Sequence, residues 1–194
     1  MSHTSYYSSP LTARTALLSV VMILCAAATA FAGGAIEIEE DRSAPEGHAV
    51  YRFEGGYVDL SVEGENLRVE VKGPTDGWVA VGFDPESRML GANFIIGYVN
   101  DSGVRVEDHY GHSATGHRQD SDHGGSEDIL ERSGSEDESG TTLTFLIPLD
   151  SGDERDRPLQ SGAELLMLVA YGPRGADNLT AVHAGRGSVR VRVP

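Results

Sequence analysis

The sequence predicts an all-β sandwich. Hydrophobic residues alternate with polar ones through most of the chain after residue 32, as they do in strands with one buried and one exposed face. Gly-rich turns separate these runs at short intervals. Beyond residue 32 no segment shows the 3.6-residue spacing of an amphipathic helix. Short strands joined by tight turns are typical of two packed antiparallel sheets.

Six segments with period-two alternation are expected to be half-buried strands. They contain Val58, Leu60 and Val62; Leu67, Val69 and Val71; Val79, Val81 and Phe83; Val104 and Val106; Leu143, Phe145 and Ile147; and Val189, Val191 and Val193. Two further runs, 94–99 and 165–171, are hydrophobic at both parities. Such runs indicate strands that are covered on both sides or that line an internal pocket. We expect these two in the middle of the fold.

The first 32 residues are predicted to be a signal peptide that precedes the fold. Residues 1–14 contain no acidic residue, and residues 15–32 are a continuous run of apolar and small residues. Ala28-Thr29-Ala30 and Ala30-Phe31-Ala32 are candidate cleavage sites. An uncleaved membrane anchor is the alternative, because about 18 apolar residues approach the length of a span. We expect a periplasmic or secreted protein whose residues 33–194 form one domain, with no stable membrane span after cleavage.

Composition excludes several classes of function. The chain has 15 Lys plus Arg against 30 Asp plus Glu, a formal charge of -15, which disfavours binding to nucleic acid. Its one cysteine, Cys25, excludes a disulfide framework, a Cys-rich zinc site, an iron–sulfur cluster and covalent c-type haem attachment. Any metal or haem must therefore be held by His, Met, carboxylate or backbone groups. Since no hydrolase, nucleotide-binding or metalloprotease motif is present, we expect the protein not to be an enzyme.

Residues 111–140 break the alternation and are expected to form a long acidic loop that contains histidines. The segment consists mainly of Gly, Ser, Asp, Glu and His, with Ile129 and Leu130 as the one plausible short strand. A loop of this length in a compact domain is commonly functional or disordered. A solvated surface, a lid over a pocket and an acidic docking surface are the interpretations that it leaves open.

Several motifs, taken in order, resemble the DOMON domain. They are 77–83 (GWVAVGF), 89–99 (MLGANFIIGYV), 106–110 (VEDHY), 142–150 (TLTFLIPLD), 170–172 (AYG) and 183–188 (HAGRGS). The resemblance covers nearly all of residues 36–193. It implies an immunoglobulin-like antiparallel β-sandwich of roughly ten strands, in agreement with the alternation.

The resemblance implies a ligand-binding function of one of two kinds. Some DOMON domains bind b-type haem between a Met and a His and transfer electrons, and these ligands fall on Met89 and His183. The chain then resembles a cytochrome b module with a redox partner protein in trans. Other DOMON domains resemble modules for carbohydrate or another small molecule, which would use the same pocket, expected at the end of the sandwich.

Met–His ligation leaves iron no open position, which suits electron transfer and not oxygen activation. It requires Met89 and His183 to approach one iron, with their sulfur and nitrogen about 4–5 Å apart. Aromatic walls for the porphyrin are expected from Phe83, Phe94 and Tyr98, together with Ile96, and Arg186 is expected to pair with a propionate. In the carbohydrate alternative, Trp78 and Tyr98 would stack on a sugar. Met89 as a packing residue and His183 as a strand cap are the structural alternatives.

A second candidate metal site lies within the predicted loop and the strand before it. It would combine four histidines with carboxylates in a set that suits zinc, copper or another divalent ion: His109, His112, His117, His123, Asp120 and Asp122. Solvated histidines are the alternative. Calcium held by Asp120, Asp122 and Asp128 is a third possibility, although the spacing of an EF-hand is missing.

Overall fold

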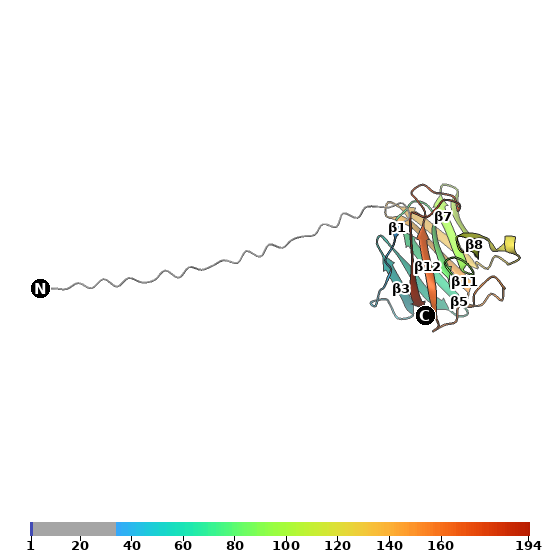
Figure 1. The fold of residues 1–194 in the computed structure, drawn as a ribbon, viewed down its shortest axis with the longest axis horizontal. Coiled ribbons are helices and arrows are strands. Elements are labelled where there is room, and N and C mark those ends of the chain that lie inside the picture. The colour runs from blue at the N-terminus through green and yellow to red at the C-terminus, as the bar shows by residue number, and fades with distance from the viewer. Residues whose placement is uncertain (2–33) are drawn as a thin grey trace.

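The computed structural model describes Met1 and residues 34–194, which form two β-sheets packed face to face (Figure 1). The predicted all-β sandwich is therefore confirmed. The predicted signal segment, 1–32, lies outside the described residues except for Met1. In the part of the chain that the structure describes, no helix has the length and hydrophobicity needed to cross a membrane.

The first sheet has seven strands in the order β1-β13-β12-β6-β7-β8-β9. Their bounds are β1 Gly34–Ala35, β13 Gly185–Arg192, β12 Glu164–Tyr171, β6 Val79–Phe83, β7 Asn93–Asn100, β8 Gly103–Ser113 and β9 Gly116–Gln119. Neighbouring strands are antiparallel except for β1 and β13, which are parallel. The two doubly hydrophobic runs form β7 and β12 on either side of the central β6, as expected.

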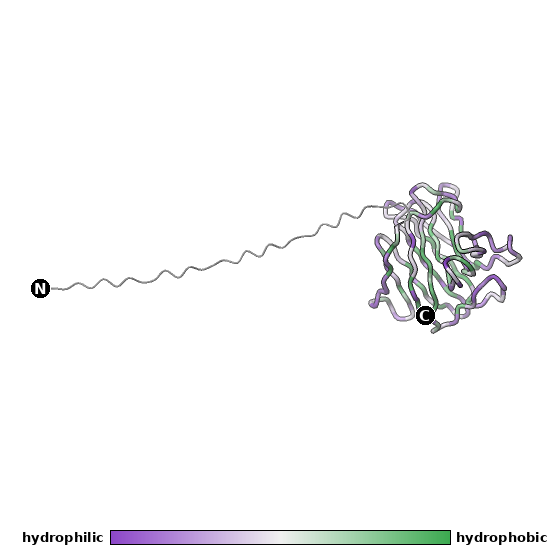
Figure 2. The backbone as a smooth tube through the Cα atoms, in the orientation of Figure 1, coloured by the Kyte–Doolittle hydropathy of each residue, from purple (hydrophilic) through white to green (hydrophobic). Residues whose placement is uncertain are grey.

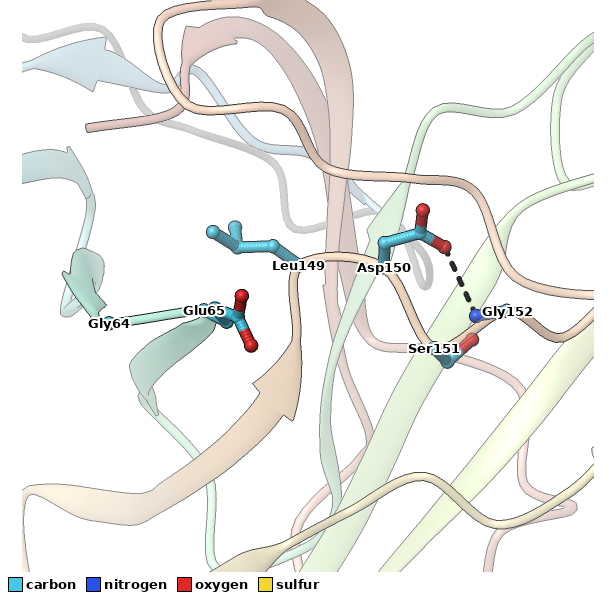
Figure 3. Close-up of a pocket in the computed structure, with 6 residues that line it drawn as sticks. All are labelled: Gly64, Glu65, Leu149, Asp150, Ser151 and Gly152. Atoms are coloured by element: carbon cyan, nitrogen blue, oxygen red, sulfur yellow. Dashed lines mark hydrogen bonds between the residues drawn. The ribbon is translucent and has the colours of Figure 1, made fainter.

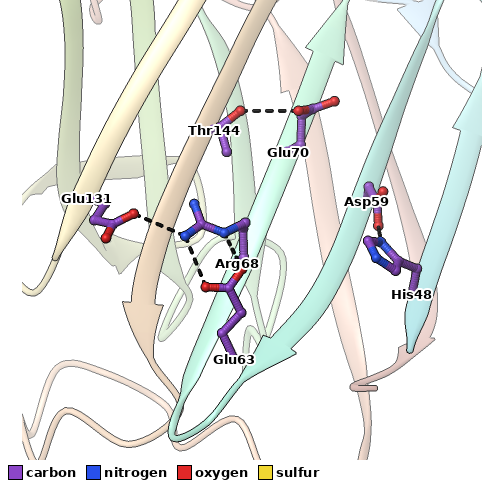
Figure 4. A network of polar contacts seen from close by, with 7 residues as sticks. All are labelled: His48, Asp59, Glu63, Arg68, Glu70, Glu131 and Thr144. Atoms are coloured by element: carbon purple, nitrogen blue, oxygen red, sulfur yellow. Dashed lines mark hydrogen bonds and ion pairs between the residues drawn. The ribbon is translucent and has the colours of Figure 1, made fainter. Parts of the chain in front are cut away.

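The second sheet has six antiparallel strands in the order β10-β11-β5-β4-β3-β2. Their bounds are β10 Glu131–Asp137, β11 Gly140–Pro148, β5 Asn66–Gly73, β4 Gly56–Glu63, β3 His48–Phe53 and β2 Glu39–Glu40. Its outer face carries polar pairs (Figure 4): Arg68 donates to Glu63 and Glu131, and His48 lies 2.9 Å from Asp59. Exposed ion pairs of this kind contribute about 0–1 kcal/mol each to the stability of the fold.

The core lies between the two sheets and follows from the alternation. On β6, Val79, Val81 and Phe83 face the other sheet and are at most 1% exposed. Inward side chains of β5 and β11, such as Val69 and Phe145, meet them and are equally buried. Figure 2 shows hydrophobic residues along the strands and hydrophilic residues in the loops at their ends. Burial of each large apolar side chain stabilises the fold by about 1.5–3 kcal/mol, so the interleaved faces hold the sheets together.

The prediction that 111–140 is one long loop is wrong. The end of β8, β9, a 3₁₀ turn (η1, Asp120–His123) and β10 lie within this segment. β10 has almost no hydrophobic residue, and six of its seven residues are exposed. Its conformation comes from pairing with β11 over Glu131–Asp137, a long-range interaction that local hydrophobic periodicity does not reveal. As an edge strand, β10 is protected from further pairing by its charged side chains.

After β11 the chain makes a tight turn against the β4–β5 turn (Figure 3). Leu149 N donates to Glu65 O at 2.9 Å, and Gly152 N donates to the Asp150 carboxylate at 3.0 Å. A hollow of about 510 Å³ lies between these two turns, lined mostly by backbone and by the carboxylates of Glu65 and Asp150. The turn directs residues 150–157 back along the end of the sandwich toward β7 and β8, where Asn93 donates to Asp156.

Candidate functional site

A large pocket in the described residues lies on the outer face of the seven-stranded sheet and has a volume of about 1180 Å³. Outward side chains of β6, β7 and β12 and of the residue before β6 form its floor: Trp78, Ala80, Phe94, Ile96, Tyr98, Leu168 and Ala170. The expectation of a pocket at the end of the sandwich is therefore wrong. Because the central strands are apolar on both faces, the outer face can hold a ligand while the inner face packs the core.

Alternation along β6 decides which aromatic residues reach the pocket. Trp78 and Ala80 face outward and pack with Ile96 and Tyr98 of β7. Phe83 has the opposite parity, is 1% exposed and belongs to the core between the sheets. The prediction that Phe83 lines the ligand pocket is therefore corrected, whereas Trp78, Tyr98 and Phe94 do line it.

Met89 lies in the β6–β7 connection, residues 84–92, and lines the pocket. Two non-glycine residues of this connection have positive φ, Asp84 at 47° and Arg88 at 56°, a conformation that costs roughly 1–2 kcal/mol. Such strain persists where neighbouring contacts enforce it. Here Ala92 N donates to Met89 O at 3.1 Å, and Gly91 N donates to Gly111 O of β8 at 2.8 Å.

Arg157 supports the same connection from outside. Its Nη2 donates to Glu86 Oε1 at 2.5 Å and its Nε donates to Gly91 O at 3.3 Å. The position of Met89 thus depends on β8 and on the segment that follows β11, both distant from it in sequence.

His183 lies in the β12–β13 connection, residues 172–184, and is half-buried. Its Nδ1 atom is buried and has no hydrogen-bond partner within the described residues. Burial, and then the nearby guanidinium of Arg186, lower the pKa of His183 below its usual value. The imidazole is therefore neutral near pH 7 and keeps a lone pair for a ligand. A hydrogen bond to its own backbone opposes this lowering of the pKa, so the interpretation of His183 as an internally bonded residue stays an alternative.

Met89 and His183 line the same pocket from opposite ends of β6. At one end of β6, Val79 pairs with Tyr171, the last residue before the His183 connection. At the other end, Phe83 is the last residue before the Met89 connection. Four residue steps separate the two ends of β6, roughly 13 Å along the strand. The two connections therefore close the pocket from its two ends, over an apolar floor.

Arginines are concentrated around the pocket even though the chain is strongly acidic. Four line it: Arg88, Arg105, Arg118 and Arg186. Arg105 pairs with Glu107, whereas the other three have no ion-pair partner among residues 34–194. Unpaired guanidinium groups beside an apolar floor favour a ligand that is largely apolar and carries anionic groups.

The second predicted metal site does not assemble as one ligand set. His109 Nε2 lies 2.9 Å from Glu107 Oε2, and His109 Nδ1 lies 2.8 Å from His117 Nδ1. Since the carboxylate only accepts, His109 donates from Nε2 and accepts from His117 at Nδ1. Both nitrogens of His109 are then engaged within the protein. Burial, then His109 and His112, lower the pKa of His117 to about 4.

The remaining members of that set make other contacts, although His112 lies near enough to His117 to lower its pKa. His112 and His123 stack with ring centroids 5.3 Å apart. Asp122 is exposed and lines the pocket, whereas Asp120 is buried and belongs to a different group of carboxylates. The six predicted residues are therefore divided among four environments.

A group of aspartates that the sequence interpretation did not combine lies behind the pocket. Among the described residues, only Asp108, Asp128 and Asp156 bring three ligand atoms within 4.8 Å of one another. Asp108 and Asp128 flank the predicted histidine site, but Asp156 lies after β11 and no local pattern connects it with them. The acidic content of 150–156 was the one available indication.

Comparison with protein families finds one match. The sequence model of the DOMON domain matches residues 57–172, more than half of the chain. This range includes Met89 and the floor strands β6, β7 and β12, and it ends at residue 172, before His183. No curated protein matches the chain.

Proposed function

Because the chain belongs to the DOMON domain family of ligand-binding modules, we propose that it binds a b-type haem in the pocket on the seven-stranded sheet. Met89 and His183 would be the axial ligands. The observation that carries the proposal is that a thioether and a neutral imidazole with a buried, unpartnered nitrogen line one apolar pocket.

Several residues of the pocket suit this cofactor, whereas ligation of one iron by both Met89 and His183 requires their sulfur and nitrogen to approach within about 4–5 Å. Trp78, Ile96 and Tyr98 offer an apolar floor for a porphyrin face or edge. Arg186 projects beside His183 and would pair with a propionate carboxylate, as guanidinium groups do with carboxylates. The low pKa of His183 removes the competition between a proton and iron near pH 7.

Haem bound by Met and His would supply reversible one-electron chemistry with no open coordination position. The residues of the chain would hold this group and exclude water from it. The strained and braced Met89 connection would keep the thioether in place during reduction and oxidation, which lowers the reorganisation that electron transfer requires. On this proposal the protein is not an enzyme. It exchanges electrons with a partner protein outside the cytoplasm.

A carbohydrate ligand is the second candidate, favoured by the buried indole nitrogen of Trp78. Trp78 lines the pocket, and its buried indole nitrogen has no acceptor among the described residues, so a ligand oxygen that reached it would satisfy it. However, Trp78 is 5% and Tyr98 is 9% exposed, whereas stacking on a sugar requires an open ring face. The haem proposal uses these rings as packed floor and is the better supported.

Haemin titration of the full chain, followed by absorption spectra before and after dithionite, tests the proposal. We expect one haemin per chain and a sharp reduced α band of the b type. Met89→Leu keeps an apolar side chain without sulfur, and His183→Gln keeps a polar one without imidazole; both should lose the six-coordinate spectrum. His48→Gln, on the outer face of the other sheet, is the matched control.

Two results would contradict the proposal. One is a colourless protein that takes up no added haemin. The other is a wild-type spectrum that survives both ligand substitutions. Binding of a glycan that quenches Trp78 fluorescence, in a protein that ignores haemin, would establish the carbohydrate alternative.

A further inference from the structure

Five aspartates meet at the end of the sandwich where β8 and the segments before β10 and after β11 come together. We call Asp108, Asp120, Asp128, Asp153 and Asp156 the aspartate cluster. Asp108 comes from β8, Asp120 from η1, Asp128 from the segment before β10, and the last two from residues 150–157. Ligand atoms of Asp108, Asp128 and Asp156 all lie within 4.8 Å of one another.

Several oxygens of the aspartate cluster are buried without a partner. Asp108 is 3% exposed, and its Oδ1 accepts no hydrogen bond among the described residues. Asp120 is 1% exposed, and neither of its carboxylate oxygens has a partner there. A buried carboxylate without a hydrogen bond is costly in free energy, so these oxygens require either protons or a cation.

The negative charges of the aspartate cluster are not balanced by nearby cations. Burial, and then repulsion from Asp156, raise the pKa of Asp108 to about 8; burial and Asp156 likewise raise that of Asp120 to about 7. Arg155 is the one cation that opposes this shift at Asp120. The guanidinium of Arg155 does not form an ion pair with Asp120, and its Nε donates to the backbone oxygen of His123.

We propose that the aspartate cluster binds one divalent calcium ion. Every side chain that converges on the position ligates through oxygen, and a set of carboxylates without nitrogen or sulfur suits a hard cation. Ca²⁺ takes six to eight oxygen ligands in flexible geometry, which fits carboxylates from three separate segments better than the strict octahedron of Mg²⁺.

Polar groups around the cluster hold these carboxylates in place. Asn93 Nδ2 donates to Asp156 Oδ1 at 2.6 Å, and Ser151 Oγ donates to Asp156 Oδ2 at 2.7 Å. Ser126 N donates to Asp153 Oδ2 at 2.5 Å, and Ser126 Oγ donates to Asp128 Oδ2 at 3.0 Å. These hydrogen bonds fix the orientation of the carboxylates, as donors next to metal ligands do in known metal sites.

The ion would connect three segments that otherwise repel one another. One of them, 150–157, ends at Arg157, which donates to Glu86 and Gly91 O beside Met89. Calcium would therefore stiffen the Met89 connection although it does not touch the pocket. Binding of the ion does not depend on which ligand occupies the pocket.

Calorimetric titration of CaCl₂ into the chelator-treated full chain at pH 7.5 tests the proposal, with thermal unfolding as a second readout. We expect one site per chain, a higher unfolding temperature with CaCl₂, and a smaller effect of equimolar MgCl₂. Asp156→Asn and Asp128→Asn each remove one ligand charge and should weaken calcium binding by about tenfold or more. Glu154→Gln is the matched control, because Glu154 is exposed in the same segment and makes no ion pair among the described residues.

The variants remain informative if they change folding. Removing a charge from a repulsive cluster should raise the unfolding temperature of the calcium-free protein, so loss of the calcium response cannot be attributed to a damaged fold. No heat and no change in unfolding temperature would overturn the proposal. Equal loss in Glu154→Gln, or a response to Zn²⁺ but not Ca²⁺, would overturn it as well.

Discussion

A Cβ atom on Gly111 would lie 1.8 Å from the carbonyl oxygen of Met89. Gly111 is in β8 and Met89 is in the β6–β7 connection, so the close approach of two backbones sets the position of the Met89 side chain. Gly111 N also donates to Ala92 O at 2.9 Å, which ties the end of that connection to β8. A glycine is required here for space and not for its torsion angles.

Gly111→Ala should therefore displace Met89 from the pocket. Because the opposing atom belongs to backbone, the connection must move, at a cost of about 1–3 kcal/mol in the free energy of unfolding. Haemin binding should weaken by about 1–2 kcal/mol, roughly fivefold to thirtyfold. Denaturant unfolding and haemin titration measure the two effects.

Gly47→Ala is the control for this substitution. Gly47 has a φ of 82°, and a Cβ there would meet no atom within 4 Å. Its replacement should cost about 1 kcal/mol of stability through the backbone alone and leave haemin affinity unchanged. Unchanged haemin affinity in Gly111→Ala would show that Met89 does not depend on this contact.

Phe83→Leu and Phe94→Leu should have opposite consequences. Phe83 is in the core, so its substitution should lower the free energy of unfolding by about 1–2 kcal/mol without altering haemin affinity. Phe94 lines the pocket, so its substitution should reduce haemin affinity by about 0.5–1.5 kcal/mol through lost aromatic contact. Parallel unfolding and haemin titrations distinguish the two, and a loss of affinity in Phe83→Leu would contradict the assignment of faces.

This contrast shows what the sequence could and could not predict at the site. The strand 79–83 was recognised from its alternation, and the same alternation places Trp78 and Phe83 on opposite faces. The alternation of side chains along this strand therefore excludes Phe83 from the face that carries Trp78. That Met89 and His183 line one pocket could not follow from their separation, because the fold alone brings the two connections together.

Long-range pairing explains the other differences. The half-buried strands were predictable because period-two alternation is a local property of the sequence. β10 was not, since its exposed polar residues become a strand only by pairing with β11. Asp156 meets Asp108 and Asp128 only through tertiary contacts. The spacing of residues around the histidines therefore indicates sequence neighbours and gives no sign of these three carboxylates.

Arg186→Gln should weaken haemin binding by about 1–2 kcal/mol, roughly fivefold to thirtyfold, by removing a charge-assisted hydrogen bond to a propionate. The difference from wild type should shrink as salt concentration rises, since the pair is partly exposed. Arg190→Gln is the matched control, because Arg190 lies on the same strand with the same parity but does not line the pocket. Equal effects of the two substitutions would indicate a general charge effect and contradict a specific pair.

Acid should destabilise the domain through His117. Burial, and then His109 and His112, lower the pKa of His117 to about 4 from its usual value of 6.5. Between these two pH values the unfolded chain binds a proton that the folded chain does not, so stability falls as the pH falls from 6.5 to 4. The slope contributed by one such group is about 1 kcal/mol per pH unit or less.

The aspartate cluster works in the opposite direction, because carboxyl groups with raised pKa values favour the folded state as pH falls. The contribution of His117 is therefore measured as a difference between wild type and His117→Gln, with the unfolding free energy determined by urea at several pH values from 4 to 7. The difference should change with pH across this window. Glu107 and His109 remain in both proteins, but His109 loses its hydrogen-bond partner at Nδ1 in His117→Gln. A difference that is constant from pH 7 to 4 would show that His117 takes up its proton equally in the folded and unfolded states, contrary to its burial beside two other imidazoles.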